Sequence, residues 1–258
     1  MPTMDLGLDG KVAVVLGASR GLGKAIAHSL AKEGCRLAIC ARGEADLTST
    51  AEELGTETFA RALDVTEENA VESFIAEVEE RFGRLDVVIG NVGGNRRGAA
   101  HEVPLEEWRA LWSLNFESHL RAARAAIPGM KERGGGSIVF VASIYGREAG
   151  GPGLAAYNAT KSALISLAKV LALDVAADGI RVNTVAPGSI RFPGGSWDRR
   201  CHDDPEGMAR FVEQNLPIGR FGHAEEIGDV VAFLASERAS LITGACLNVD
   251  GGQSKSLI

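Results

Sequence analysis

The chain has 258 residues, 45% of them hydrophobic, and a formal net charge of −7. This length fits one domain over residues 1–258, and the acidic balance argues against nucleic acid as a partner. The mean hydropathy is +0.04, and no apolar run reaches the roughly 18 residues that a membrane span needs. Residues 1–11 also lack the basic and apolar pattern of a signal peptide. We therefore predict a cytoplasmic protein without a membrane partner.

A glycine-rich turn follows the first predicted strand, at residues 11–16 (KVAVVL), and precedes a helical run that ends near Glu33. Glycines allow a backbone to approach a pyrophosphate closely, and the N-terminus of the next helix offers free N–H groups to an anion. The turn therefore predicts a dinucleotide site, although glycines also serve ordinary turns. Its candidate cofactor residues are Gly17, Ser19, Arg20, Gly21, Leu22 and Gly23.

The second predicted strand, at residues 36–41, leads to Arg42. Sites for NAD place an acidic residue near this strand end to bind the ribose 2′-hydroxyl, and none is present here. Arg42 and Arg20 could instead pair with a 2′-phosphate. We therefore favour NADP(H) over NAD(H), while a solvated surface position remains open for either arginine.

The next two predicted strands, at residues 58–63 and 85–89, also end in polar or glycine-rich segments. Asp64, followed by Val65, could accept a hydrogen bond from an adenine amine or cap the following helix, for which Thr66 is the candidate N-cap. Apolar residues at helical spacing place that helix between Thr66 and Gly83. The segment Asn91-Val92-Gly93 could place its backbone flat against a ligand or form a simple turn.

Residues 105–130 have a mostly helical pattern that Pro128-Gly129 should interrupt. Asn115 shares a face with Leu105, Trp108 and Trp112, so we expect this face to be buried. A buried amide usually bonds to backbone, and it can also hold a water or bend the helix. His119, on the same face, should be a buried histidine with satisfied hydrogen bonds.

The fifth predicted strand, at residues 137–142, delivers Ser143 to its carboxyl end, where ligands bind in open α/β sheets. A helical run over residues 155–177 then places Tyr157 and Lys161 four residues apart, on one face. A nearby ammonium lowers the pKa of a phenol, and the Ser143 hydroxyl could hold a substrate oxygen beside it. A Y-x-x-x-K spacing alone is common on ordinary helices, so the interpretation depends on the rest of the chain.

The remaining segments complete a regular alternation of strands and helices. Strands are predicted at residues 181–185, before Pro187-Gly188, and at residues 246–249. Residues 189–216 have little periodicity, and we predict a loop that forms a lid over the substrate. The alternation predicts an α/β fold, a single-domain Rossmann-type doubly wound sheet of seven parallel strands with helices on both faces.

The cysteines give no sign of a metal site. Four are present, at positions 35, 40, 201 and 246, and no C-x-x-C pair occurs. Cys201-His202-Asp203-Asp204 has ligand-type side chains but no distant partner cluster, so we expect a solvated surface and no metal.

Together, the glycine turn, Asp64-Val65, Asn91-Val92-Gly93, Asn115, Ser143, Tyr157, Lys161, Pro187-Gly188 and the ending Asn248-Val249-Asp250-Gly251-Gly252 resemble the short-chain dehydrogenase/reductase family over essentially the whole chain. Within that family, the sequence is most similar to the 3-oxoacyl-(acyl carrier protein) reductase group. The resemblance implies a small-molecule carbonyl or acyl-thioester substrate and a homotetramer in which the helices of Asn115 and Tyr157 pack against their copies.

The resemblance also implies individual roles. Tyr157 would be the general acid in reduction, Lys161 would lower its pKa and bind the nicotinamide ribose, and Ser143 would hydrogen-bond the reacting oxygen. Asn115 would hold a water in a proton relay to Lys161. Ile190, after Pro187-Gly188, would support the nicotinamide amide through its backbone.

Three positions depart from the family pattern. Leu16 replaces a threonine, Gly90 replaces the first asparagine of Asn-Asn-Ala-Gly, and Phe192 replaces a threonine that often contacts the nicotinamide amide. Other functions remain open: an NAD-dependent alcohol or sugar dehydrogenase, or a non-catalytic dinucleotide sensor. Candidate substrate-pocket residues are Gly94, Asn95, Arg96, Ile144, Tyr145, Phe192 and Trp197.

Overall fold

The computed structural model describes residues 5–257. Its centre is a seven-stranded parallel sheet with the order β3-β2-β1-β4-β5-β6-β9. The strands are β1 (Val12–Leu16), β2 (Arg36–Ala41), β3 (Thr58–Ala62), β4 (Val87–Gly90), β5 (Gly136–Val141), β6 (Ile180–Pro187) and β9 (Cys246–Val249). The predicted doubly wound α/β fold is confirmed, and the strand order reverses between β1 and β4, where such sheets bind ligands.

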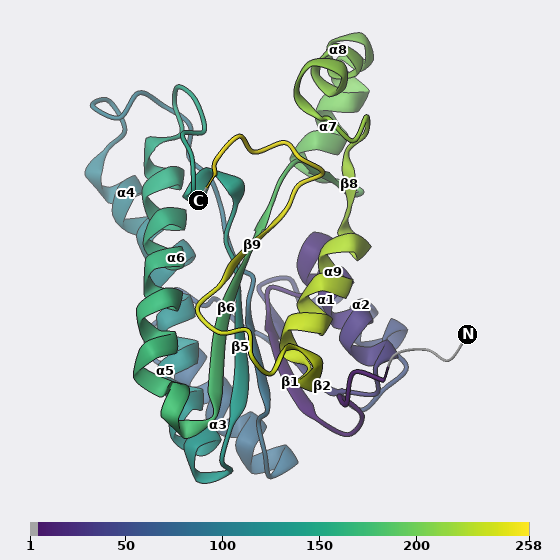
Figure 1. The fold of residues 1–258 in the computed structure, drawn as a ribbon, viewed down its shortest axis with the longest axis vertical. Coiled ribbons are helices and arrows are strands. Elements are labelled where there is room, and N and C mark those ends of the chain that lie inside the picture. The colour runs from purple at the N-terminus through teal and green to yellow at the C-terminus, as the bar shows by residue number, and fades with distance from the viewer. Residues whose placement is uncertain (1–4, 258) are drawn as a thin grey trace.

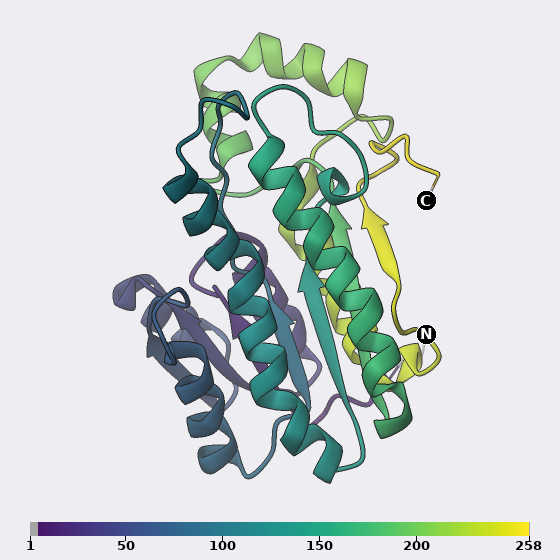
Figure 2. The same cartoon turned by 90° about the vertical axis from the view of Figure 1, so that its left-hand side faces the viewer.

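Two helical layers cover the sheet (Figures 1 and 2). One face carries α1 (Gly21–Lys32), α2 (Glu44–Glu53) and α9 (Ala224–Ala235), and the other carries α3 (Ala70–Phe82), α5 (Ser118–Glu132) and α6 (Ala155–Val175). The side chains of β1 alternate between the two layers: Ala13 and Val15 pack on the side of α1, α2 and α9, whereas Val12, Val14 and Leu16 pack on the side of α3, α5 and α6. Because both faces of β1 are buried, this strand is a continuous apolar run, as the sequence predicted.

Some predicted boundaries were wrong. Helix α3 begins after Asn69, and Thr66 instead donates to Asp64 through its backbone N–H and its hydroxyl. Pro128 lies inside α5, which continues to Glu132. The segment predicted as a loop at residues 189–216 contains α7 (Ser196–Asp203) and α8 (Pro205–Asn215). Both are short and polar outside, so their periodicity was too weak to read.

Helices α7 and α8 lie beyond the carboxyl ends of the strands (Figure 1). They are joined to the main body through a second, two-stranded sheet of β7 (Ile190–Arg191) and β8 (Gly222–His223). The sequence predicted neither strand, because two residues carry no readable alternation.

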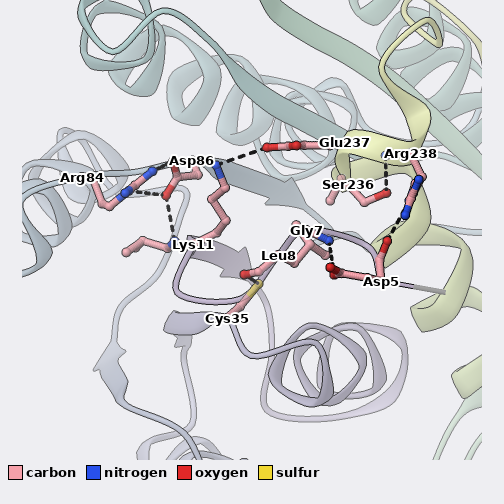
Figure 3. Close-up of polar contacts among 12 residues, drawn as sticks. Asp5, Gly7, Leu8, Lys11, Cys35, Arg84, Asp86, Ser236, Glu237 and Arg238 are labelled. Atoms are coloured by element: carbon pink, nitrogen blue, oxygen red, sulfur yellow. Dashed lines mark hydrogen bonds and ion pairs between the residues drawn. The ribbon is translucent and has the colours of Figure 1, made fainter. Parts of the chain in front are cut away.

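The opposite edge of the sheet is fixed by polar contacts (Figure 3). The Asp86 carboxylate accepts from the backbone N–H of Val12 at 2.9 Å and from Arg84 Nε at 2.8 Å, which ties β1 to the segment before β4. Arg238 Nε donates to the Asp5 carbonyl at 2.7 Å and holds the first described residues against the end of α9. This anchored edge lies at the far end of the strands from the candidate site.

Candidate active site

The candidate site lies at the carboxyl edge of the sheet, where β1, β4, β5 and β6 end. The glycine-rich turn follows β1, the 91–93 segment follows β4, Ser143 follows β5, and Pro187-Gly188 closes β6. The structure therefore brings together, at one edge, the segments that the sequence singled out separately. Asn91 holds the segment after β4 against the glycine-rich turn after β1, because its Nδ2 donates to the carbonyls of Leu16 and Gly17 at 3.2 and 3.0 Å.

The glycine-rich turn is packed too closely for side chains. A Cβ on Gly23 would collide with the Gly17 carbonyl and the Asn91 amide. The backbone N–H of Gly17 donates to the Cys40 carbonyl at 2.8 Å, which joins the turn to β2. Helix α1 begins at Gly21 without a side-chain cap, so the N–H groups of its first turn remain available to an anion.

The two arginines proposed for a 2′-phosphate are exposed at this edge. Arg42 Nη1 lies 3.9 Å from Asp64 Oδ2, and the Arg42 side chain is 80% exposed. Burial alone would raise the pKa of Asp64, but hydrogen bonds from Thr66 and the charge of Arg42 outweigh it and lower that pKa. Asp64 thus also caps the turn that precedes α3, one of the two roles predicted for it.

Ser143 and Tyr157 meet across the site, with the Ser143 hydroxyl close enough to the phenol to act on its pKa. The Ser143 Oγ accepts from the backbone N–H of Tyr145 at 3.2 Å, so the hydroxyl hydrogen is free to point at the phenol. Asn158 fixes the intervening loop, because its Nδ2 donates to the carbonyls of Tyr145 and Glu148 at 2.6 and 2.7 Å. A hydroxyl and a phenol are therefore held side by side, ready to share one substrate oxygen.

The electrostatics of Tyr157 differ from the prediction. Burial raises the pKa of its phenol, and the Ser143 hydrogen bond offsets only part of this effect. Lys161 is buried as well; its Nζ donates to the Val141 carbonyl at 2.8 Å, and burial lowers its pKa to about 8. The lowered phenol pKa that was expected is wrong for this structure: burial dominates, and Lys161 is not among the groups that shift the pKa of Tyr157.

Asn115 is completely buried, as predicted, and bonds mainly to backbone. Its Oδ1 accepts from Gly94 N at 2.8 Å, and its Nδ2 donates to Gly94 O and to Thr160 Oγ1, each at 3.0 Å. Asn115 sits in a π-helical turn, Ser113–Glu117, between α4 (Leu105–Trp112) and α5. It thus ties the loop after β4 to α6 and to the Tyr157 region.

The π-turn also explains a wrong prediction about the helix face. Leu105 is 68% exposed and Trp112 is 39% exposed, although both were expected on the buried side with Asn115. The extra residue in a π-turn rotates the face of the helix between Trp112 and Asn115. Sequence reasoning also missed Thr160, which holds Asn115 in place, because it gives no signal apart from lying between Tyr157 and Lys161.

His119 is buried beneath Gly90. It was expected to have satisfied hydrogen bonds, but only one of its two ring nitrogens has a well-aligned partner among the described residues. Its Nδ1 lies 3.1 Å from Ser118 Oγ, whereas its Nε2 forms no well-aligned hydrogen bond within residues 5–257. Burial and then the nearby Lys161 charge lower the pKa of His119 to about 3, so the ring is neutral at physiological pH. A Cβ on Gly90 would collide with His119 and lie 2.8 Å from Phe140 Cδ1.

We therefore expect Gly90→Ala to destabilise the protein by about 2 kcal/mol through overpacking. In a His119→Ala background, the same change should cost less, because the closer of the two rings is gone and only the Phe140 contact remains. Urea unfolding of the two single variants and the double variant measures this coupling. Equal costs in both backgrounds would show that His119 does not occupy the space that Gly90 leaves.

The structure also bears on the residues considered for a metal and for the substrate pocket. Within residues 5–257, no group of three metal-ligand side chains could hold an ion, and His202 Nδ1 instead contacts the Asp198 carbonyl at 2.8 Å. None of the helices in this range is long and apolar enough to cross a bilayer. Arg96, a candidate pocket residue, pairs with Glu107 at 3.3 Å.

The chain matches a known protein family over most of its length. The family model described as enoyl-(acyl carrier protein) reductase matches residues 17–254. A 3-oxoacyl-[acyl-carrier-protein] reductase of Escherichia coli is 37% identical over 96% of this chain and 98% of its own length. The chain belongs to the short-chain dehydrogenase/reductase family. It is therefore an oxidoreductase of the class that uses nicotinamide dinucleotides, as the sequence indicated.

Solved structures of this family show the breadth of its chemistry. L-Sorbose reductase from Gluconobacter frateurii, complexed with NADPH and L-sorbose, matches with a TM-score of 0.93 at 36% identity, over 98% of this chain and all of that chain. A 7α-hydroxysteroid dehydrogenase complexed with NADH matches with a TM-score of 0.90 at 28% identity, over all of both chains. Members of the family thus bind either dinucleotide, and family membership alone fixes neither the cofactor nor the substrate.

Proposed function

We propose that the protein is an NADPH-dependent carbonyl reductase in which Tyr157 donates the proton. The observation that carries this proposal is the meeting of the Tyr157 phenol and the Ser143 hydroxyl at the carboxyl edge of the sheet, close enough for Ser143 to act on the pKa of the phenol, beside the buried Lys161. A ketone oxygen placed between the two hydroxyls would accept hydrogen bonds from both, so the charge that develops on it during reduction is stabilised.

The glycine-rich turn fits a dinucleotide, which would supply the hydride. Its pyrophosphate would lie at the N-terminus of α1, beside Gly17, Ser19, Gly21, Leu22 and Gly23. Asp64 and Val65 would face the adenine, and Asn91, Val92 and Gly93 would lie along the ribose. A Cβ on Gly93 would come 3.4 Å from Lys161 Nζ, so this backbone and the ammonium border the same space. Pro187, Gly188 and Ile190 would support the nicotinamide.

The proton path would continue from Tyr157 towards Lys161 and Asn115. Both side-chain donors of Asn115 are already used by Gly94 and Thr160. A water in the relay would therefore bond to main-chain groups of the π-turn, where the regular helical hydrogen bonds are interrupted.

We infer that the substrate is a small ketone or a 3-oxoacyl thioester, a class that the Escherichia coli relative's name suggests. The test is NADPH oxidation with 3-oxoacyl thioesters, small ketones, diketones and keto sugars. Turnover of one class supports the proposal. Binding of NADPH without its oxidation by any of them would favour the alternative, a non-catalytic dinucleotide sensor.

For the cofactor, we predict that NADPH stabilises the protein more than NADH at equal concentration. The exposed Arg20 and Arg42 can pair with a 2′-phosphate, which only NADPH carries. A ligand at 100 times its Kd adds about 2.7 kcal/mol to the free energy of unfolding, so thermal shifts resolve the difference. Arg42→Ala should reduce the difference between the thermal shifts with NADPH and NADH. A larger shift with NADH would instead support the alternative, an NAD-dependent alcohol or sugar dehydrogenase.

We also propose a homotetramer in the cytoplasm, with α5 and α6 packed against their copies. On α6, Val170 is 54% exposed and Leu173 is 71% exposed. Together with Ser166, they form an exposed surface on one face of this helix. Leu173→Arg should therefore lower the mass measured by sedimentation. The matched control is Leu241→Arg, at a 96% exposed position outside both helices, which should leave the mass unchanged. A monomeric wild-type chain would overturn the assembly.

A further inference from the structure

The ring of Phe192 is held between two glycines from different parts of the chain. A Cβ on Gly21 would lie 2.7 Å from Phe192 Cε2, and a Cβ on Gly195 would lie 2.9 Å from the same atom. Such distances are shorter than real side-chain contacts, so the ring fills the space of both missing side chains. The Gly195 N–H donates to the Phe192 carbonyl at 2.9 Å, which closes a tight turn before α7.

One of these glycines belongs to the proposed dinucleotide site. Gly21 is the first residue of α1, and the N–H groups of that helix end are the proposed partners of the pyrophosphate. A phenyl ring offers no hydrogen bond to an anion there. The ring therefore lies against the residue at which the proposed pyrophosphate site begins.

A space that could receive the ring lies directly beside it. A cavity of about 750 Å³ opens between α7, α8 and the β7–β8 pair, and Phe192 forms part of its wall. We call this space the lid cavity; its other apolar lining residues include Pro193, Pro205, Met208, Val212 and Phe221. An engineered cavity of about 150 Å³ accommodates benzene, so the lid cavity is large enough for a phenyl side chain.

We propose that Phe192 gates the dinucleotide site: its ring rests on Gly21 when the site is empty and moves into the lid cavity when a dinucleotide binds. This inference depends on the dinucleotide site of the proposed function. Phe192 would thereby be a specificity-determining residue, because only a ligand that binds the turn tightly can displace the ring. The ring would lower the apparent affinity in proportion to the fraction of molecules in which the turn is open.

The movement should be transmitted to Trp197 in α7. Arg191 Nε and the Gly194 N–H both donate to the Asp198 carboxylate, at 2.9 and 3.1 Å, so the backbone on each side of Phe192 is fastened to α7. Trp197 packs against Phe221 in a tilted arrangement, with ring centroids 5.3 Å apart, and Phe221 lines the lid cavity. A ring entering the cavity must therefore change the surroundings of Trp197.

The first measurement is tryptophan fluorescence in a Trp108→Phe/Trp112→Phe variant, in which Trp197 is the remaining tryptophan of the three. Titration with NADP⁺ should change the Trp197 emission in step with binding measured by calorimetry. In the same background, Phe192→Ala should bind NADP⁺ about tenfold more tightly and lose most of the emission change, because no ring has to move.

Two further variants keep the result interpretable. Phe192→Leu, which retains apolar packing under the lid, should bind with intermediate affinity. Phe211→Ala removes another aromatic of the α7–α8 region, one that stacks on Trp197 at 4.7 Å, whereas the atoms nearest to Gly21 belong to Phe192, so it should leave NADP⁺ affinity within about twofold of wild type.

Unchanged or weaker NADP⁺ binding by both Phe192 variants would overturn the gate and make the ring a simple wall of the site. Binding by wild type without a Trp197 response would overturn it as well. If neither wild type nor Phe192→Ala bound NADP⁺ or NAD⁺, the proposed function itself would fail. Binding by Phe192→Ala alone would support the gate in its strongest form.

Discussion

Tyr157→Phe should lower the rate of ketone reduction by about 10³-fold while NADPH binding stays nearly intact. The variant loses one hydroxyl, which is the proposed proton donor, and proton transfer by a positioned side chain contributes about 10²–10⁴-fold to a rate. The aromatic ring that remains continues to fill its place on α6. Steady-state kinetics on the substrate found in the ketone screen, together with calorimetric titration of NADPH, measure the two effects separately.

The matched control is Tyr145→Phe, which removes the other phenol of the chain. Tyr145 follows Ser143 in the loop and is a candidate contact for substrate, so its loss should alter KM more than kcat. If Tyr157→Phe retained wild-type turnover, the proton donor would have to be another group. If it lost NADPH binding as well, the role of Tyr157 would be structural.

The raised pKa of Tyr157 favours the proposed direction of the reaction. Burial keeps the phenol protonated across the physiological pH range, so it is ready to donate to a substrate oxygen. Oxidation of an alcohol needs the phenolate instead, which must form against the same burial. We therefore expect reduction to remain active at neutral pH and oxidation to require a higher pH.

The strands were the most predictable part of the fold. Strand β2 is a short apolar run whose middle residues are buried, and it was predicted with its observed bounds. The edge strand β9, which is only partly buried, was also predicted with its observed bounds. The chemistry could also be placed, because side chains after the ends of parallel strands must meet at one edge. Ser143 after β5 and the helix of Tyr157 illustrate this rule.

Features that depend on contacts between distant segments could not be predicted. The burial that raises the pKa of Tyr157 comes from the whole site, whereas the sequence shows only that Lys161 is one helical turn away. The π-turn around Asn115 changes which side of the helix is buried, and no residue pattern announced it. Likewise, Phe192 was recognised as unusual in sequence, but only the structure shows that its ring rests on Gly21.

Lys161→Met should make the protein more stable at pH 6.5 by about 2 kcal/mol, although we expect it to damage activity. Burial lowers the pKa of Lys161 from 10.5 to about 8, which corresponds to a cost of about 3 kcal/mol for keeping the ammonium charged. Methionine fills a similar volume without a charge. The loss of the hydrogen bond to the Val141 carbonyl costs about 1 kcal/mol, which lowers the expected gain in stability to about 2 kcal/mol.

The stability difference between wild type and Lys161→Met should depend on pH. Between about pH 8 and 10.5, the unfolded chain holds a proton on Lys161 that the folded chain has released. Wild-type stability therefore gains from this group as pH rises through that window, and the full cost is present below pH 8. The advantage of Lys161→Met should accordingly be largest below pH 8 and shrink towards pH 10.5.

Urea unfolding at pH 6.5, 8 and 9.5 measures the effect (about 1 kcal/mol is easily resolved by this method). Lys169→Met is the matched control, because Lys169 is an exposed lysine two turns further along α6, and its replacement should change stability by less than about 0.5 kcal/mol at each pH. A Lys161→Met protein that is less stable than wild type at pH 6.5 would show that the ammonium stabilises the fold. A gain in stability together with a loss of turnover would instead mean that the fold keeps a costly buried charge for the reaction.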